Sequence, residues 1–186
     1  MDRDQILAVI KRHVANENIV KHMLAMEAFM KALAKHLDED EFSWAIAGLV
    51  HDLDYFGETT PQEHGLKVRE ILKEENINLP ENILQAVAAH NWHNNKVEPK
   101  TRMDWALFCG DSLTGLIVAC ALVMPKKRLA SVTVESVLKK FPVKRFAAGT
   151  RREDIKMCQE KLGIPLEEFI AIALESMQGI SQDLGL

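Results

Sequence analysis

Residues 48–56 read "GLVHDLDYF", an apolar stretch that leads directly into His51 and Asp52 and then into a second aspartate, Asp54. The apolar periodicity around this stretch predicts a helix over about 40–53 that is mostly buried. An ionised carboxylate is costly in such a place unless a partner neutralises it. The fold and the function of the chain therefore depend on what other segments place beside Asp52.

Apolar residues recur with helical spacing along almost the whole chain, and the strand-like segment "VTVESVL" at 132–138 is short and isolated. Thr60 and Thr150 are typical N-cap residues and predict two of the helix starts. We therefore predict an all-α bundle that forms a single domain over residues 1–186, with 125–150 as an irregular segment or lid. The expected helices cover about 2–14, 17–36, 40–53, 60–75, 81–90, 101–123, 131–140, 150–162 and 165–183.

Composition narrows the class of protein. The chain has 186 residues, 47% hydrophobic and 27% charged, with a net charge of −4, so it lacks the basic footprint of a general nucleic-acid binder. Its N-terminal segment is charged and lacks the apolar core of a secretory signal. The cysteines, Cys109, Cys120 and Cys158, are scattered, which indicates reduced thiols in a cytoplasmic protein. We expect no nucleic acid polymer and no membrane as partner, and homo-oligomerisation stays open.

Residues 105–124, "WALFCGDSLTGLIVACALVM", form an apolar run of roughly membrane-spanning length with Asp111 as their single charge. A transmembrane helix is one interpretation. The alternative, which we favour, is a central helix of a bundle that is apolar all round because other helices surround it. On that interpretation Asp111 is a second buried carboxylate.

Histidines on other predicted helices also face inward. His22 and His90 have apolar residues three, four or seven positions away, so each lies on an apolar helix face. One such histidine alone is usually a core residue with an ordinary hydrogen bond. The set is harder to explain, because no inward basic residue is evident to neutralise Asp52 and Asp111. A divalent cation would neutralise the carboxylates and take imidazole nitrogens as ligands, and such ligands suit Fe, Mn, Co, Ni or Zn.

The order of these residues resembles a known signature. His22, the pair His51–Asp52 and Asp111 resemble the H…HD…D pattern of the HD-domain superfamily of metal-dependent phosphohydrolases. The resemblance covers about residues 15–120 and implies an HD-domain helical bundle. The local contexts are also similar: "VKHMLAMEAFMKALA" (20–34), "AGLVHDLDYF" (47–56) and "FCGDSLTGLI" (108–117).

Two further histidines extend the resemblance to the binuclear branch of the superfamily. His64 lies in "QEHGLKVREIL" and His90 in "AVAAHNWHNN", which makes the order H…HD…H…H…D. The chain departs from the cyclic-dinucleotide enzymes of that branch, since it has "LDYF" after the HD pair and lacks their HHE and GYP sequences. Cyclic dinucleotides are therefore not implied. The resemblance implies that Asp52 bridges two ions, with His22, His51 and Asp111 on the first and His64 and His90 on the second.

The resemblance further implies hydrolysis of a phosphomonoester or phosphoanhydride bond of a small phosphorylated substrate, such as a nucleotide, by hydroxide that one or two ions activate. Asp54 would orient the water or protonate the leaving group, or else simply cap a turn. Lys144 and Arg151 are candidate contacts for the substrate phosphate, with a solvated basic edge as the alternative. His93 is a spare ligand, a substrate contact or a solvated loop residue.

Two other functions stay open on the sequence. One is a regulatory module whose HD site binds a metal or ligand without turning it over. The other is an HD-type di-iron oxygenase, because that branch resembles the hydrolases in its ligand plan.

Overall fold

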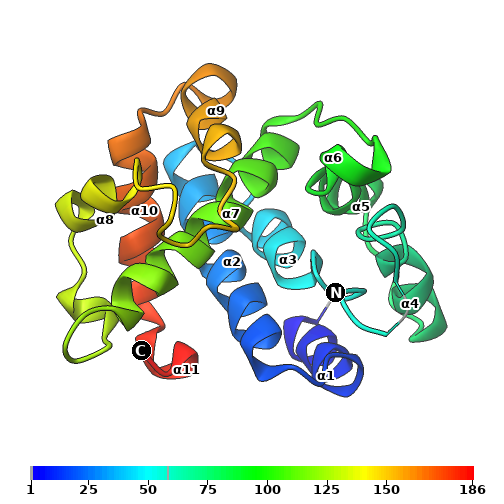
Figure 1. Ribbon diagram of the computed structural model, residues 1–186. Coiled ribbons are helices and arrows are strands. Elements are labelled where there is room, and N and C mark those ends of the chain that lie inside the picture. Colours follow the sequence, from blue (N-terminus) through cyan, green and yellow to red (C-terminus); the bar gives the residue numbers. More distant parts are fainter. Residues whose placement is uncertain (1, 58) are drawn as a thin grey trace.

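The computed structural model describes residues 2–57 and 59–186, and within these ranges it contains helices and no strand. This confirms the predicted all-α class; the division of the chain into domains stays a prediction. The helices are α1 (Arg3–His13), α2 (Glu17–His36), α3 (Glu41–Val50), α4 (Val68–Glu74), α5 (Glu81–Ala89), α6 (Trp92–Asn95), α7 (Arg102–Leu122), the 3₁₀ turn η1 (Leu129–Ser131), α8 (Val134–Lys140), α9 (Arg152–Leu162), α10 (Leu166–Gly179) and α11 (Ser181–Leu184) (Figure 1).

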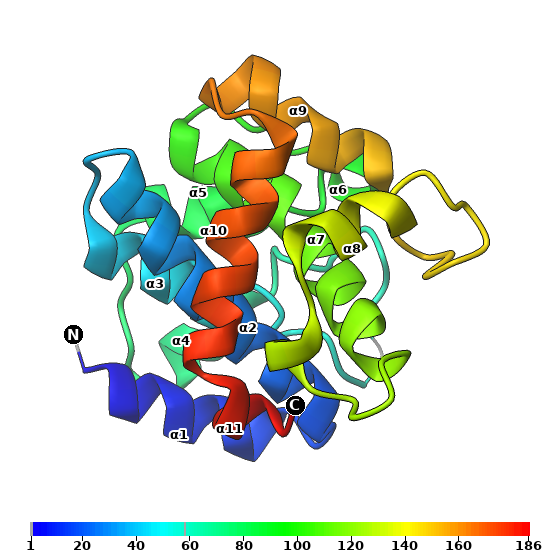
Figure 2. The ribbon, with the colours of Figure 1, turned by 90° about the vertical axis from the view of Figure 1, so that its left-hand side faces the viewer.

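Helices α2 and α7 form the centre of the bundle. Helix α2 packs against α3, α7 and α10, and α7 also packs against α5 and α9. Figure 2 shows α10 running along one side of the molecule, with α1 and α11 at one end. The predicted central helix is thus present as α7. By length and composition α7 is the one described helix that could cross a membrane, but 67% of its tested window is buried inside the fold.

Two glycines let the central helices approach one another closely. A Cβ atom on Gly48 in α3 would lie 2.5 Å from the backbone oxygen of Met26 in α2, and a Cβ on Gly110 in α7 would meet the ring of Phe29 in α2. Only a residue without a side chain fits at such contacts. Helices α2 and α7, which carry His22 and Asp111, and α3, which Asp52 follows, therefore lie close together because of glycines in the interiors of α3 and α7.

The helix predicted from Thr60 begins later than expected. The Thr60 N–H does donate to Glu63 Oε2 at 3.0 Å, as a capping box would have it, but regular helix starts only at Val68. Gly65 lies between them with φ = +83°, and a Cβ there would be 2.8 Å from the Val87 oxygen. A left-handed residue interrupts a right-handed helix, so residues 61–67 form a series of turns instead.

The start of α9 also differs from the prediction. Arg151, rather than Thr150, occupies the N-cap position, and its side chain makes no capping hydrogen bond. The guanidinium group of the next residue, Arg152, hydrogen-bonds to the loop that precedes α9. It donates to five backbone oxygens, those of Phe141, Val143, Phe146, Ala147 and Thr150. This arginine therefore fixes the shape of the segment that leads to Arg151.

Candidate metal centre

Six side chains that the sequence singled out lie together in the structure, although they come from five separate parts of the chain. One lies within α2 and one within α7. Two follow directly after α3, one sits in the turns before α4, and one follows α5. In the same order, these residues are His22 (α2), Asp111 (α7), His51 and Asp52 (after α3), His64 (before α4) and His90 (after α5).

The first group of ligand atoms surrounds one oxygen of Asp52. The Nε2 atoms of His22 and His51 are 3.1 Å apart, and they lie 3.6 Å and 3.5 Å from Asp52 Oδ2. Asp111 Oδ1 lies 3.0 Å from His22 Nε2 and 3.8 Å from His51 Nε2. Two imidazole nitrogens and two carboxylate oxygens thus face a common point.

The second group surrounds the other oxygen of the same carboxylate. Asp52 Oδ1 lies 3.3 Å from His64 Nε2 and 3.6 Å from His90 Nε2, and those two nitrogens are 3.0 Å apart. Within each of two triplets, His22–His51–Asp52 and Asp52–His64–His90, the ligand atoms lie within 4.8 Å of one another. Asp52 therefore presents one oxygen to each pair of histidines.

Hydrogen bonds on the far side of each ring determine which nitrogen carries the proton. The Nδ1 of His51 lies 2.8 Å from the Gly48 carbonyl oxygen, and the Nδ1 of His90 contacts the Val87 carbonyl oxygen. A carbonyl oxygen can only accept, so both Nδ1 atoms are protonated. In the neutral form of each ring the Nε2 atom then carries a lone pair.

The same holds for the other two histidines. Thr114 donates its hydroxyl proton to the Asp111 carbonyl at 3.0 Å, so it accepts from His22 Nδ1 at 3.2 Å. His64 Nδ1 donates to the Asp54 carboxylate at 2.8 Å. All four rings thus aim an Nε2 atom at the centre, which is how metal-binding histidines are commonly oriented by their outer hydrogen bonds.

This arrangement fits a divalent ion in each group. Two neutral rings that point lone pairs at each other across 3.0–3.1 Å repel one another unless a positive charge lies between them. A cation attracts both lone pairs and also neutralises the buried Asp52 carboxylate. Imidazole and carboxylate donors are the ligands of Fe, Mn, Co, Ni and Zn, so the residues present fit the predicted ions.

When metal is absent, protons on the histidines supply part of the positive charge that the buried carboxylates require. Burial lowers the pKa of His51 to about 4, which keeps that ring neutral at pH 7. Burial also opposes the charging of His22, but its hydrogen bond to Asp111 and the charge of that carboxylate outweigh burial and raise the pKa of His22. Burial likewise opposes ionisation of Asp52, yet the neighbouring histidines hold the pKa of its carboxyl well below the usual value.

Metal binding should therefore be linked to pH through His64. Burial opposes the charging of this ring, but hydrogen bonds to Asp52 and Asp54 outweigh it and raise the pKa of His64 to about 9, above the ordinary 6.5. In metal-free protein its contribution to stability is complete below pH 6.5 and is lost as the pH rises through about 9. A metal must displace this proton, so we expect affinity to rise by about tenfold per pH unit over the same interval.

Chelator competition for Mn²⁺ between pH 6.5 and 9 measures this linkage, and calorimetry in buffers of different ionisation enthalpy counts the protons released. An affinity that does not change over this interval would show that metal displaces no proton from His64 there.

Asp54 has a different place from the predicted one. Its side chain is fully buried, Oδ1 accepts from His64 Nδ1, and Oδ2 accepts from the Gly65 N–H at 2.7 Å. With both oxygens bonded inside the protein, Asp54 is not placed to orient water or to protonate a leaving group. It is a positioning residue that orients the His64 ring.

We expect Asp54→Ala to weaken metal binding by about 10–100-fold, as the loss of an outer hydrogen-bond partner of a ligand typically does. Asp54→Asn keeps an acceptor for the His64 ring and should weaken binding less. Titration of the chelator-treated variants with Mn²⁺ distinguishes the two. If both variants bound metal as the unaltered protein does, the positioning role would be wrong.

Of the two predicted phosphate contacts, the structure places one beside the centre. A cavity of about 170 Å³ borders the centre and is lined by His64, His90, Asp111 and Arg151, among others. The backbone N–H of Arg151 donates to Ser112 Oγ at 3.3 Å, which holds the residue next to α7. Lys144 is exposed and does not line this cavity. Its predicted substrate contact is therefore not supported by its position.

His93 has a partner that sequence reasoning missed. Its Nε2 lies 2.9 Å and 3.0 Å from the two oxygens of Asp154 in α9, so it ties α6 to α9 instead of reaching either group of ligand atoms. Asn91 was missed as well. It follows His90 directly, and its buried amide donates to the backbone oxygens of Pro61 and His64. Adjacency to a predicted ligand was the only signal for it.

The fold and this centre define an all-α protein with a His/Asp site suited to divalent metal. A model of the HD domain family matches residues 19–114, just over half of the chain, and this segment contains all six converging side chains. The protein therefore belongs to the HD domain family. No curated protein and no solved structure gives a significant match to the chain.

Proposed function

We propose that the protein is a metal-dependent phosphohydrolase that cleaves a phosphomonoester or phosphoanhydride bond of a small substrate such as a nucleotide. The observation that carries the proposal is the Asp52 carboxylate, which offers one oxygen to each of two histidine pairs. When bound, divalent ions would supply an acidified water and polarise a phosphoryl oxygen.

Each residue of the site has its own role in this proposal. Asp52, Asp111 and the histidine pairs would hold the ions, and Asp54 keeps the ring of His64 in its orientation. Arg151 binds the phosphate. Its guanidinium makes no hydrogen bond or ion pair with any other residue that the structure describes, and it lines the cavity that borders Asp111. An arginine can pair with two phosphoryl oxygens at once, which orients the phosphate as well as binding it.

Elemental analysis of protein purified without chelators, combined with a screen of phosphate esters and anhydrides for phosphate release, tests the proposal. We expect one or two transition-metal ions per chain and hydrolysis that a chelator abolishes. Full metal without hydrolysis of any compound would favour the regulatory module. Oxygen consumption with a polyol or phosphonate would favour the di-iron oxygenase. As part of the proposal, the substrate is a small molecule in the cytoplasm, and neither a nucleic acid polymer nor a membrane.

A further inference from the structure

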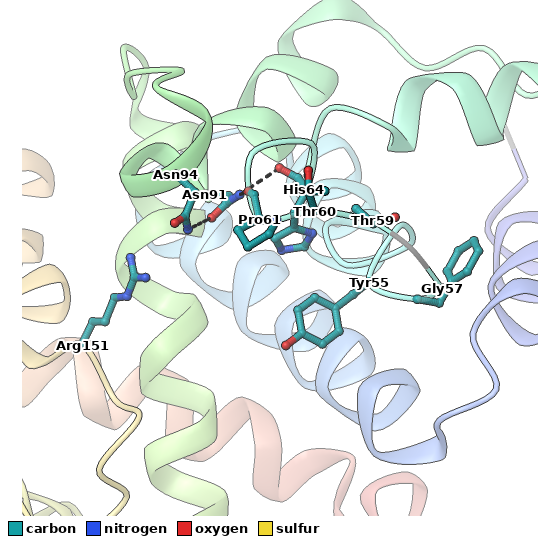
Figure 3. Close-up of a pocket in the computed structure, with 10 residues that line it drawn as sticks. Tyr55, Gly57, Thr59, Thr60, Pro61, His64, Asn91, Asn94 and Arg151 are labelled. Atoms are coloured by element: carbon teal, nitrogen blue, oxygen red, sulfur yellow. Dashed lines mark hydrogen bonds between the residues drawn. The ribbon is translucent and has the colours of Figure 1, made fainter.

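We propose that a second cavity, beside His64, binds the group to which the substrate phosphate is attached, and that this group carries a flat aromatic ring. The inference rests on the proposed function. The cavity has a volume of about 470 Å³, within the usual range for small-molecule sites. We call it the Tyr55 cavity; its walls include Tyr55, Thr59, His64, Asn91, Asn94 and Arg151 (Figure 3).

The Tyr55 cavity adjoins the metal centre. His64, Asn91 and Arg151 line both this cavity and the smaller one that borders Asp111. The two cavities therefore lie side by side across these three residues. A molecule whose phosphate sits at the centre therefore has the Tyr55 cavity directly beside it.

Tyr55 gives this cavity an aromatic wall that the protein itself leaves uncovered. The residue is 57% exposed although it directly follows the buried Asp54 in the chain. Its ring contacts the His64 ring, at 5.2 Å between centroids and an angle of 70°, and stacks on no other ring in the described part of the chain. A ring held in this way offers its surface to a flat ligand, and aromatic pairs gain more than their buried area alone provides.

Two amide groups of the cavity, those of Asn91 and Asn94, are held in place. The Asn91 NH₂ group donates to two backbone oxygens, those of Pro61 at 2.6 Å and His64 at 3.0 Å. Carbonyl oxygens only accept, so the orientation of this amide is determined, and its oxygen accepts from Asn94 at 2.6 Å. The Asn94 amide oxygen is then left without a partner among the described residues and can accept one hydrogen bond from a ligand.

Figure 3 shows Arg151 and Tyr55 on opposite sides of the cavity, with Asn94 and His64 between them. The site thus combines a cation toward the phosphate, an aromatic surface and the oriented Asn94 acceptor, with the hydroxyl groups of Tyr55 and Thr59 also in its walls. A ring with one hydrogen-bond donor matches what these residues provide.

Two phosphonates that cannot be hydrolysed test this subsite apart from turnover. Calorimetry compares phenylphosphonate with methylphosphonate on Mn²⁺-loaded protein. We expect phenylphosphonate to bind about tenfold more tightly, because the Tyr55 ring covers it. Tyr55→Leu should reduce the ratio of the phenylphosphonate affinity to the methylphosphonate affinity to nearly one, while leaving methylphosphonate binding unchanged. Arg151→Gln should weaken both ligands by the same factor and leave the preference intact.

Phe42→Leu is the matched control, since Phe42 is 45% exposed and lines a different cavity, beside Glu41 and Ala45. It should change neither affinity. Equal binding of the two phosphonates, no binding of either, or an unchanged preference in Tyr55→Leu would overturn the subsite. Phosphate release in the ester screen is measured separately, so the proposed function would stand or fall on that result.

Discussion

Asp52→Ala is expected to remove metal from both groups of ligand atoms at once and to abolish the proposed metal-dependent hydrolysis. One carboxylate serves two histidine pairs, so its loss takes a ligand from both groups. It leaves His64 and His90 without a carboxylate at their Nε2 atoms, while Asp111 alone still faces His22 and His51. The loss of affinity should exceed the about 10–100-fold that follows from removing an outer hydrogen-bond partner. Elemental analysis and chelator competition measure the first effect, and phosphate release measures the second.

Circular dichroism should show that the helices of Asp52→Ala persist, because the residue follows α3 and takes part in no helix hydrogen-bond ladder that would be lost. Asp52→Asn is the closer test of charge, since it keeps the shape of the side chain. Asp183→Asn, at an exposed position in α11, is the matched control and should retain metal and activity. Full metal content in Asp52→Ala would refute the assignment of the centre.

Gly48→Ala is expected to destabilise the bundle strongly. The added methyl group would lie 2.5 Å from the Met26 oxygen and 2.7 Å from its carbonyl carbon. These atoms belong to the backbone of α2, so no side-chain rotation relieves the clash and α2 and α3 must move apart. We expect a loss of about 3 kcal/mol, at the upper end of ordinary overpacking. The melting temperature should fall by roughly 6–12 °C.

Gly115→Ala provides a control at another interior helical glycine. A Cβ there meets no atom within 4 Å, so alanine should stabilise α7 by about 0.5–1 kcal/mol through its better helix propensity. Urea unfolding of both variants, monitored by circular dichroism, gives the two values. If Gly48→Ala unfolded at the same urea concentration as the unaltered protein, the close approach of α2 and α3 would not be required.

Local signals predicted the helices well where the whole signal, such as a helix cap, lies within a few neighbouring residues. The Asn16 side chain accepts from the Asn18 N–H, and the predicted helix over 17–36 is present with these bounds. Thr101 and Asp104 form a capping box at the start of α7, which was expected from about 101. Caps and apolar periodicity act over one or two turns, so they can be read from neighbouring residues alone.

The errors lie where distant contacts override such signals. Thr60 has the expected bond to Glu63, yet regular helix starts only at Val68 because the left-handed Gly65 packs against the backbone of α5. In the sequence, Asp54 is a carboxylate two residues after Asp52, which is equally compatible with a proton donor at the centre. Only the packing of His64 and Gly65 onto both of its oxygens assigns it to positioning.

By itself, the sequence determined the helical class, the approximate helix bounds and the residue types of the centre, because periodicity, caps and donor chemistry are local properties. The tertiary structure alone decided that Asp52 divides its two oxygens between two histidine pairs, that each ring aims Nε2 inward, and that Arg151 borders the centre while Lys144 does not. These features depend on the distances and orientations between helices, which side-chain packing across the bundle sets and which no short segment encodes.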